Sequence, residues 1–144
     1  MTQDKKIVIR SRAIILHDGR LLVVKHQFTE GYTALPGGHL EWGEDVKECL
    51  RREMVEELGV EPEIGRLFYI SMFIKEGKQS IEFFFEVTNG DKFKDCKLVD
   101  ASHGHELDEI YWVSQSDKIN ILPQRLEGDF RSGKMVSDEV RFIN

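Results

Sequence analysis

Three glutamates near the end of one helical segment have the residue type and spacing of a site for a hard divalent cation. Glu53, Glu56 and Glu57 stand at i, i+3 and i+4, positions whose side chains face one another on a helix. Like charges at these spacings destabilise a helix by about 0.2–0.5 kcal/mol per pair, and the partial negative charge of a helix C-terminus opposes them further. Mg²⁺ or Mn²⁺ would remove this conflict, because both ions accept oxygen ligands.

The helical register places these carboxylates beside the buried face of the helix. At about 100° per residue, the segment has one apolar stripe, made of Val46, Cys49, Leu50, Met54 and Leu58. Glu53 and Glu57 fall within this sector, and Glu56 lies at its edge. An acid-rich helix exposed to solvent is the simpler alternative, but it would place the carboxylates opposite the stripe. The register therefore favours a cation site.

A longer pattern surrounds the glutamates. It is carried by Gly38, Glu44, Arg52, Glu53, Met54, Glu56, Glu57, Gly59 and Val60. The pattern resembles the Nudix box of the Nudix hydrolase (MutT-like) superfamily, G-x5-E-x7-R-E-U-x-E-E-x-G-U with U a bulky aliphatic residue, and no position is missing. The resemblance implies an α/β fold, a Nudix-type α/β/α sandwich with a mixed β-sheet, with residues 1–144 forming a single Nudix hydrolase domain.

The resemblance also implies an activity and a set of ligands. The activity is metal-dependent hydrolysis of the diphosphate linkage of a nucleotide or nucleoside diphosphate derivative, by attack of water at phosphorus. Arg52 would orient the carboxylates, and the cofactor would be Mg²⁺ or Mn²⁺. The implied metal ligands are Glu53, Glu56, Glu57, Glu44 and the carbonyl oxygen of Gly38. The alternative function is a catalytically silent Nudix-fold module that binds or senses a nucleotide, but such a module has no need for the complete acidic set.

The sequence leaves two locations for the general base, one in the helix and one in a later loop. Glu53 is the candidate within the helix, whereas Glu106 is the best candidate outside it and Glu109 the second. Solvated loop acids are the simpler interpretation of the latter two. The predicted catalytic residues are Glu53, Arg52, Glu56 and Glu106. A zinc site built on His103 and His105 is disfavoured, because neither a cysteine nor a third histidine accompanies them.

Contacts to the substrate are predicted in the segments before the helix. Arg12 and Lys25 are candidates for phosphate binding, although exposed cations on strands usually serve solubility. Trp42 is a candidate for lining the site, although large aromatic residues more often belong to the core. Similar alternatives apply to Arg10, Phe28, Tyr32 and Phe73.

The elements that position these residues follow from hydrophobic periodicity and turn signals. Residues 7–27 predict a β-hairpin around Asp18-Gly19, and residues 28–44 predict a loop. A helix is predicted over residues 45–58, with Gly59 as its left-handed cap. Further strands are predicted at 66–75, 80–88 and 109–113, with a short helix after Pro123. Strands interspersed with helices predict a mixed sheet packed between them.

Composition narrows the class of partner and location. The chain has 144 residues, a net charge of −6 and scattered basic residues, which argues against binding of extended nucleic acid. No apolar signal segment or membrane span is present, so a cytoplasmic location is expected. The expected partner is a small nucleotide or nucleoside diphosphate derivative, and a homodimer is possible by resemblance to the family. Residues 75–78 lack the markers of some Nudix subfamilies, so the nucleotide stays open.

Overall fold

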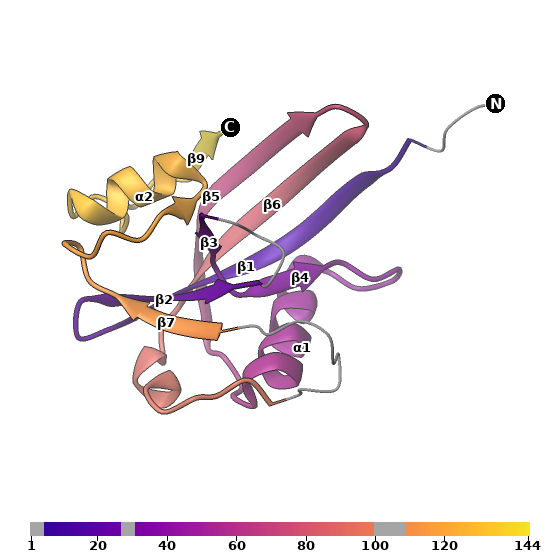
Figure 1. The fold of residues 1–144 in the computed structure, drawn as a ribbon. Coiled ribbons are helices and arrows are strands. Elements are labelled where there is room, and N and C mark those ends of the chain that lie inside the picture. The colour runs from indigo at the N-terminus through magenta and orange to yellow at the C-terminus, as the bar shows by residue number, and fades with distance from the viewer. Residues whose placement is uncertain (1–4, 27–30, 100–108) are drawn as a thin grey trace.

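The computed structural model describes residues 5–26, 31–99 and 109–144 (Figure 1). Its strands are β1 (Ile7–His17), β2 (Arg20–Lys25), β3 (Thr33–Ala34), β4 (Gly37–His39), β5 (Ile64–Lys75), β6 (Lys78–Val87), β7 (Glu109–Val113), β8 (Ile121–Leu122) and β9 (Arg141–Ile143). Its helices are α1 (Val46–Leu58), α2 (Gln124–Arg131) and a short 3₁₀ helix (Gly90–Phe93). No helix within these ranges is long and apolar enough to cross a membrane.

The strands form one mixed, curled sheet. Their order is β8-β3-β2-β1-β6-β5-β9, with β4 also pairing with β1 and β7 with β2. The parallel pairing of β1 with β6 runs from Ile7↔Gln79 to Ile15↔Val87, whereas β5 and β6 form an antiparallel hairpin. The predicted mixed sheet is therefore confirmed.

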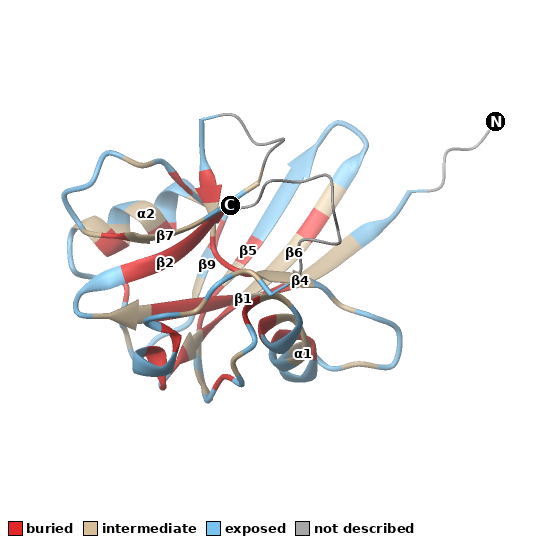
Figure 2. Cartoon of the chain, turned by 60° about the horizontal axis from the view of Figure 1, so that its bottom comes forward, coloured by how far each residue is buried: buried red, intermediate tan, exposed pale blue. Residues whose placement is uncertain are grey.

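The two helices cover opposite faces of this sheet. On β1, Ile14 packs in the cluster that contains Leu126 and Phe130 of α2. Its neighbours Ala13 and Ile15 pack in the other cluster, which contains Leu50, Met54 and Leu58 of α1. Alternate residues of a strand point to opposite faces, so α1 and α2 enclose the sheet from two sides and the predicted α/β/α sandwich is confirmed. Figure 2 shows the buried residues concentrated along β1, β2 and the inner side of α1.

The ends of α1 are set by its capping residues. Asp45 precedes the helix in extended conformation, and its carboxylate accepts hydrogen bonds from the backbone N–H groups of Lys47 (2.8 Å) and Glu48 (2.9 Å). Gly59 ends the helix in the left-handed region (φ 70°) and donates its N–H to the carbonyl of Val55 at 3.0 Å. The predicted helix and its Gly59 cap are confirmed, and the helix begins one residue later than predicted, because Asp45 caps it.

Two segments differ from the sequence prediction. Residues 28–44, predicted as a loop, contain the short strands β3 and β4, which pair with β2 and β1. Strands of two or three residues are too short to show a hydrophobic period. The hairpin at Asp18-Gly19 is confirmed, with both residues at positive φ, but β1 and β2 pair only beside the turn. Farther from the turn, β1 pairs with β4 and β6, and β2 pairs with β7.

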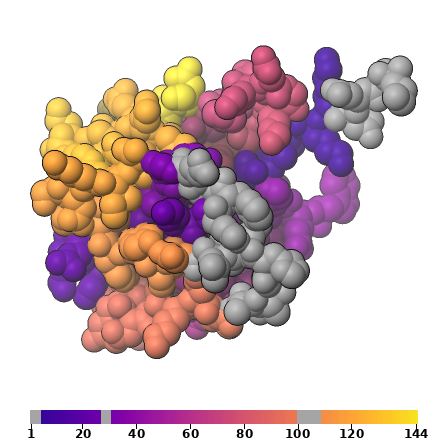
Figure 3. Space-filling view, viewed as in Figure 1, coloured from indigo at the N-terminus to yellow at the C-terminus, as the bar shows by residue number. Residues whose placement is uncertain are grey.

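The C-terminal part of the chain closes the molecule against its N-terminal strands. In the space-filling view, the orange and yellow segment that contains α2 lies against the indigo and violet segment of the first strands (Figure 3). The two parts are joined where β3 pairs in parallel with β8, which brings Thr33 opposite Ile121. The fold thereby places β4, the N-terminus of α2 and the end of β9 around one space.

Candidate active site

Helix α1 is held against the sheet next to the glycine turn. The hydroxyl of Ser11 on β1 donates a hydrogen bond of 2.6 Å to the carbonyl of Val46 in the first helical turn. The Cys49 thiol lies 3.6 Å from the Gly38 carbonyl oxygen and 3.4 Å from that of His39. Burial raises the pKa of this thiol to about 11, so it stays protonated and packs as a small core residue, as the sequence predicted.

The glycine turn lets the backbone approach both the strand and the helix. A Cβ atom at Gly37 would overlap the Ser11 carbonyl oxygen. A Cβ at Gly38 would overlap the carboxyl carbon of Glu53 and lie 2.6 Å from its Oε2 atom. The carboxylate of Glu53 therefore occupies the space that the missing side chain of Gly38 leaves. A larger residue at Gly37 would push β4 away from β1, whereas one at Gly38 would displace the flexible carboxylate of Glu53.

Arg52 lies at the centre of an acidic cluster. Its Nε and Nη2 atoms contact the two carboxylate oxygens of Glu44 at 2.8 and 3.0 Å, and Nη2 also donates to the carbonyl of His39 at 3.0 Å. Its Nη1 atom lies 3.0 Å from Glu53 and 3.3 Å from Glu56. Arg52 thus orients the carboxylates of the motif and links the helix to the loop before it.

The charges of this cluster shift its titration. The hydrogen bonds from Arg52 lower the pKa of Glu44 to about 2, and those to Glu44 and Glu53 raise the pKa of Arg52 above its ordinary value. Glu44 is therefore ionised throughout the physiological range. The side chains of Glu44 and Glu53 are each 14% exposed, whereas that of Glu56 is 58% exposed. Glu53 is thus enclosed while Glu56 reaches solvent.

The donor set fits a hard divalent cation in its chemistry. Glu53, Glu56 and Glu57 lie on one helix and Gly38 abuts Glu53, so the set offers oxygen atoms only. Within the described ranges, no three histidine, cysteine, aspartate or glutamate side chains are gathered into a metal-holding group. Arg52 contacts Glu53 and Glu56 instead. To bind a cation together, the side chains of Glu53 and Glu56 would have to rotate.

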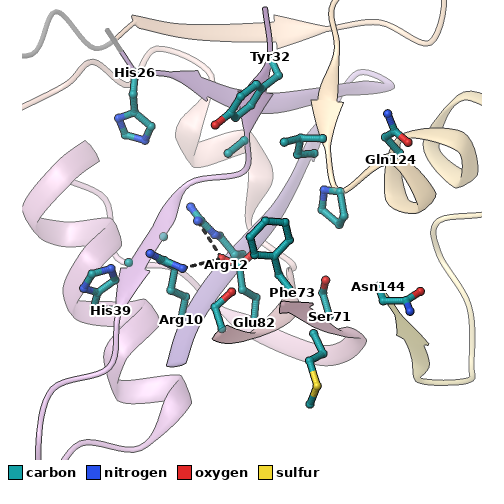
Figure 4. A pocket seen from close by; sticks show the side chains of 17 residues that line it. Arg10, Arg12, His26, Tyr32, His39, Ser71, Phe73, Glu82, Gln124 and Asn144 are labelled. Atoms are coloured by element: carbon teal, nitrogen blue, oxygen red, sulfur yellow. Dashed lines mark hydrogen bonds and ion pairs between the residues drawn. The ribbon is translucent and has the colours of Figure 1, made fainter. Parts of the chain in front are cut away.

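A cavity of about 640 Å³ opens on the other side of β4, within the roughly 300–1,000 Å³ typical of small-ligand sites. Gly37, Gly38 and His39 form its border with the acidic cluster. Figure 4 shows side chains converging on it from distant elements, chiefly Arg10, Arg12, Tyr32, Glu82, Gln124 and Asn144. The cavity and the acidic helix therefore meet at the glycine turn.

Positive charge prevails at this border. Burial, followed by the charges of Arg10 and Arg12, lowers the pKa of His39. Arg12 donates to the carbonyl of Leu35 at 2.9 Å and to Glu82 at 3.1 Å. The cavity is thus lined by arginine on the side that adjoins the motif, and by aromatic and amide side chains farther away.

Some of the residues predicted to contact the substrate line the cavity, and others do not. Arg12 lines the cavity, as do Arg10, Tyr32 and Phe73, whose roles the sequence had left open. Trp42 and Lys25 do not line it: Trp42 is fully exposed in the loop before α1, and Lys25 ends β2 opposite Glu109 of β7. Their proposed substrate contacts stay predictions that this arrangement does not support. Of the residues considered for the site in the sequence analysis, Phe28, His103, His105 and Glu106 lie outside the ranges that the structure describes.

Several cavity residues were missed by the sequence reasoning. Glu82 had a signal, since it is a lone acid between Ile81 and Phe83 in an apolar strand. Gln124 and Asn144 had none, because only the packing of α2 and β9 brings them to the cavity. The second base candidate, Glu109, begins β7 and accepts a hydrogen bond from the hydroxyl of Tyr111.

Together, the enclosing helices, the mixed sheet and the acidic motif beside a cavity define a Nudix-type domain. The family model for the NUDIX domain matches residues 8–136, and the chain belongs to this family. In class, it is a Nudix pyrophosphohydrolase. Nudix hydrolases generally use divalent metal ions.

Two relatives with a stated activity are named for different substrates. Over 116 residues, 78% of this chain and 79% of the relative, the chain is 28% identical to an 8-oxo-dGTP diphosphatase of Haemophilus influenzae. Over 56 residues, it is 41% identical to an ADP-ribose pyrophosphatase of Methanocaldococcus jannaschii. That match spans 38% of this chain and only 33% of the relative.

Among solved structures, a MutT NUDIX hydrolase from Burkholderia pseudomallei superposes with a TM-score of 0.71 at 22% identity. The match covers 92% of this chain and 99% of that chain, and it shows a shared fold. The expected homodimer and cytoplasmic location stay predictions.

Proposed function

We propose that this protein hydrolyses the diphosphate linkage of a small nucleotide or nucleoside diphosphate derivative in a reaction that depends on Mg²⁺ or Mn²⁺. The observation that carries the proposal is the contact between Glu53 and Gly38. It places the acidic helix and the cavity on two sides of one glycine. A ligand with its nucleoside in the cavity can therefore extend its diphosphate across β4 to the glutamates.

The residues of the motif have separate tasks in this proposal. Glu53, Glu56, Glu57 and the Gly38 carbonyl would hold the divalent ion, with Glu44 as a more distant contributor. Such an ion, when bound, neutralises phosphate charge and acidifies water. Arg52 keeps Glu44 and Glu53 in fixed orientation through the contacts described above. Glu53 is enclosed and close to the glycine turn, which suits a general base that takes the proton of the attacking water.

A base outside the motif is the competing assignment. Val99, which precedes Glu106 by seven positions in the sequence, donates its N–H to the carbonyl of Glu57 at 2.8 Å and therefore lies beside α1. If Glu53 is the base, Glu106→Gln leaves turnover within a few-fold of the wild type. A thousandfold loss of kcat with unchanged Mn²⁺ affinity would move the base to Glu106. Glu109→Gln, tested in parallel, distinguishes the two loop acids.

The proposal is tested by product release from a panel of nucleotides with Mg²⁺ or Mn²⁺. The panel contains 8-oxo-dGTP and ADP-ribose, the compounds for which two relatives are named, together with unmodified nucleoside triphosphates and nucleotide sugars. We expect hydrolysis of at least one compound that stops when EDTA is added. Absence of hydrolysis across the panel, with nucleotide binding retained, would contradict the proposal.

A nucleotide-binding module without catalysis is the second candidate. One observation favours it, namely that Arg52 contacts Glu44, Glu53 and Glu56, so each of these carboxylates has a partner without a metal ion, although the single guanidinium offsets only one of their three negative charges. Under this alternative, nucleotide affinity is the same with Mg²⁺ and with EDTA. Calorimetric titration in the two conditions separates the candidates, because the enzyme is expected to bind its substrate more tightly with the metal ion.

A further inference from the structure

Two arginines share one carboxylate on the floor of the cavity. Arg10 and Arg12 stand at alternate positions of β1 and therefore point to the same face, where Glu82 of the neighbouring β6 lies between them (Figure 4). Both ion pairs use the same oxygen of Glu82: Oε2 lies 3.1 Å from Arg12 and 3.5 Å from Arg10. One positive charge of the three-residue group is thus not balanced within it.

The two arginines differ in how firmly they are held. Arg12 is fixed by hydrogen bonds to the Leu35 carbonyl and to Glu82, and its side chain is 15% exposed. Arg10 approaches Glu82 at a distance longer than a normal hydrogen bond, and its side chain is 28% exposed. Arg10 can therefore exchange part of its contact with Glu82 for a ligand at little cost.

The surroundings of the two arginines increase the attraction of this excess positive charge for an anionic ligand. Burial, and next the charge of Arg12, lowers the pKa of Arg10, which indicates that the two guanidinium groups oppose each other in a partly dehydrated place. Ser71, Phe73 and Ser80, which also line the cavity, carry no charge, and burial and the two arginines lower the pKa of His39, which favours its neutral form. Poor solvation makes an unbalanced charge more effective toward a ligand than the same charge at the surface. A purely structural ion pair would need one arginine.

We infer that Arg10, Arg12 and Glu82 form an anion-binding subsite on the cavity side of β4, which takes a phosphate or carboxylate group of the substrate. The substrate's identity rests on the proposed function, whereas the subsite itself does not. The anionic group comes from one of two sources. It is either the near phosphate of the diphosphate itself or a further anionic group on the moiety that enters the cavity.

Inorganic pyrophosphate is the first probe, measured by calorimetry in EDTA. Without a divalent ion the glutamates repel this anion, so binding reports on the arginines. We expect millimolar or tighter binding that weakens with added NaCl. Arg10→Gln is expected to weaken it about tenfold, the loss of one charge-assisted contact. The matched control is Lys118→Gln, which removes one exposed positive charge from the turn before β8 and should bind as the wild type does.

Glu82→Gln tests the charge argument against an ordinary structural role. The amide keeps the size of the side chain and removes the negative charge, so we expect pyrophosphate to bind several-fold more tightly. Thermal unfolding checks that both variants remain folded. Failure of the wild type to bind pyrophosphate, unchanged affinity in Arg10→Gln, or weaker binding in Glu82→Gln would each overturn the inference.

NADH and NADPH distinguish the two sources, because they share a diphosphate and differ by one phosphate group on a ribose. If Arg10→Gln weakens both equally, the subsite holds the diphosphate. If the wild type prefers NADPH and the variant loses that preference, it holds the further anion. Equal affinity of variant and wild type for both compounds contradicts the subsite. Absence of hydrolysis with intact pyrophosphate binding would count against the proposed function alone.

Discussion

Arg52 and Glu44 form a two-point contact in which Nε and Nη2 of the guanidinium meet both oxygens of the carboxylate, at 2.8 and 3.0 Å. The two residues are eight positions apart, one in the loop before α1 and the other in the middle of the helix. This pair fixes how the loop enters the helix, and it leaves Nη1 to contact Glu53 and Glu56. The orientation of the acidic cluster therefore depends on a residue that precedes the helix.

The pair predicts how stability depends on acid. Arg52 lowers the pKa of Glu44 from 4.5 to about 2 in the folded state, so between these values the unfolded state binds more protons than the folded state. The stabilisation is complete above the unfolded value and is lost as pH falls toward about 2. We expect the free energy of unfolding to fall less steeply over this range in Glu44→Gln than in the wild type. Urea unfolding at several pH values measures it, with Glu76→Gln in the exposed β5–β6 turn as control. Parallel curves for the wild type and Glu44→Gln would contradict the assignment.

Gly38→Ala is expected to impair activity far more than stability. The added methyl group overlaps the carboxyl group of Glu53, which is the end of a flexible side chain and can rotate away. Displacement of this carboxylate should lower kcat/KM about a hundredfold, since misplacement by about 1 Å has effects of that size. Steady-state kinetics and thermal unfolding measure the two effects. Gly128→Ala is the control, because its Cβ would meet nothing within 4 Å in α2. It should preserve activity and raise stability by about 0.5–1 kcal/mol. Full activity in Gly38→Ala would remove Glu53 from the reaction.

Glu57→Gln is expected to reduce turnover nearly to background and to weaken Mn²⁺ binding. The substitution keeps the size of the side chain while removing one of the negative charges that the proposed cation needs. Turnover with the active nucleotide and Mn²⁺ titration followed by electron paramagnetic resonance provide the two measurements. Glu48→Gln removes an exposed charge on the opposite side of the same helix and should leave both values unchanged. Normal turnover in Glu57→Gln would end the metal proposal.

Tyr69→Phe is expected to lower the free energy of unfolding by about 1 kcal/mol while preserving the fold. The buried Tyr69 hydroxyl donates to Asp129 of α2 at 2.7 Å, and the Arg141 guanidinium stacks 3.9 Å from the centre of its ring. Phenylalanine keeps the stacking and loses the hydrogen bond that joins β5 to α2. Urea unfolding measures the difference. Tyr111→Phe, whose hydroxyl bonds at the exposed start of β7, is the comparison and should cost less. A loss no greater than that of Tyr111→Phe would show that the buried bond is not stabilising.

Local rules explain why the helix could be predicted and the strands around the cavity could not. The apolar stripe and the Gly59 cap depend on residues close together in the chain, so they are visible in the sequence, whereas Asp45, predicted as the first helical residue, is the N-terminal cap. β4 has three residues and two glycines, and it exists because β1 pairs with it. Trp42 illustrates the opposite case, since an aromatic residue within the motif is fully exposed, and its contact with the substrate stays a prediction.

The sequence by itself determined the acidic motif, its helix and the family to which the chain belongs, because spacing along a helix converts directly into shared position on one face. Only the tertiary structure decided which residues line the cavity. Arg12 and Glu82 are separated by 70 positions, and they meet because β1 runs parallel to β6 in a particular register. A shift of that register by one residue would turn Glu82 to the other face of the sheet, and no local pattern encodes this choice.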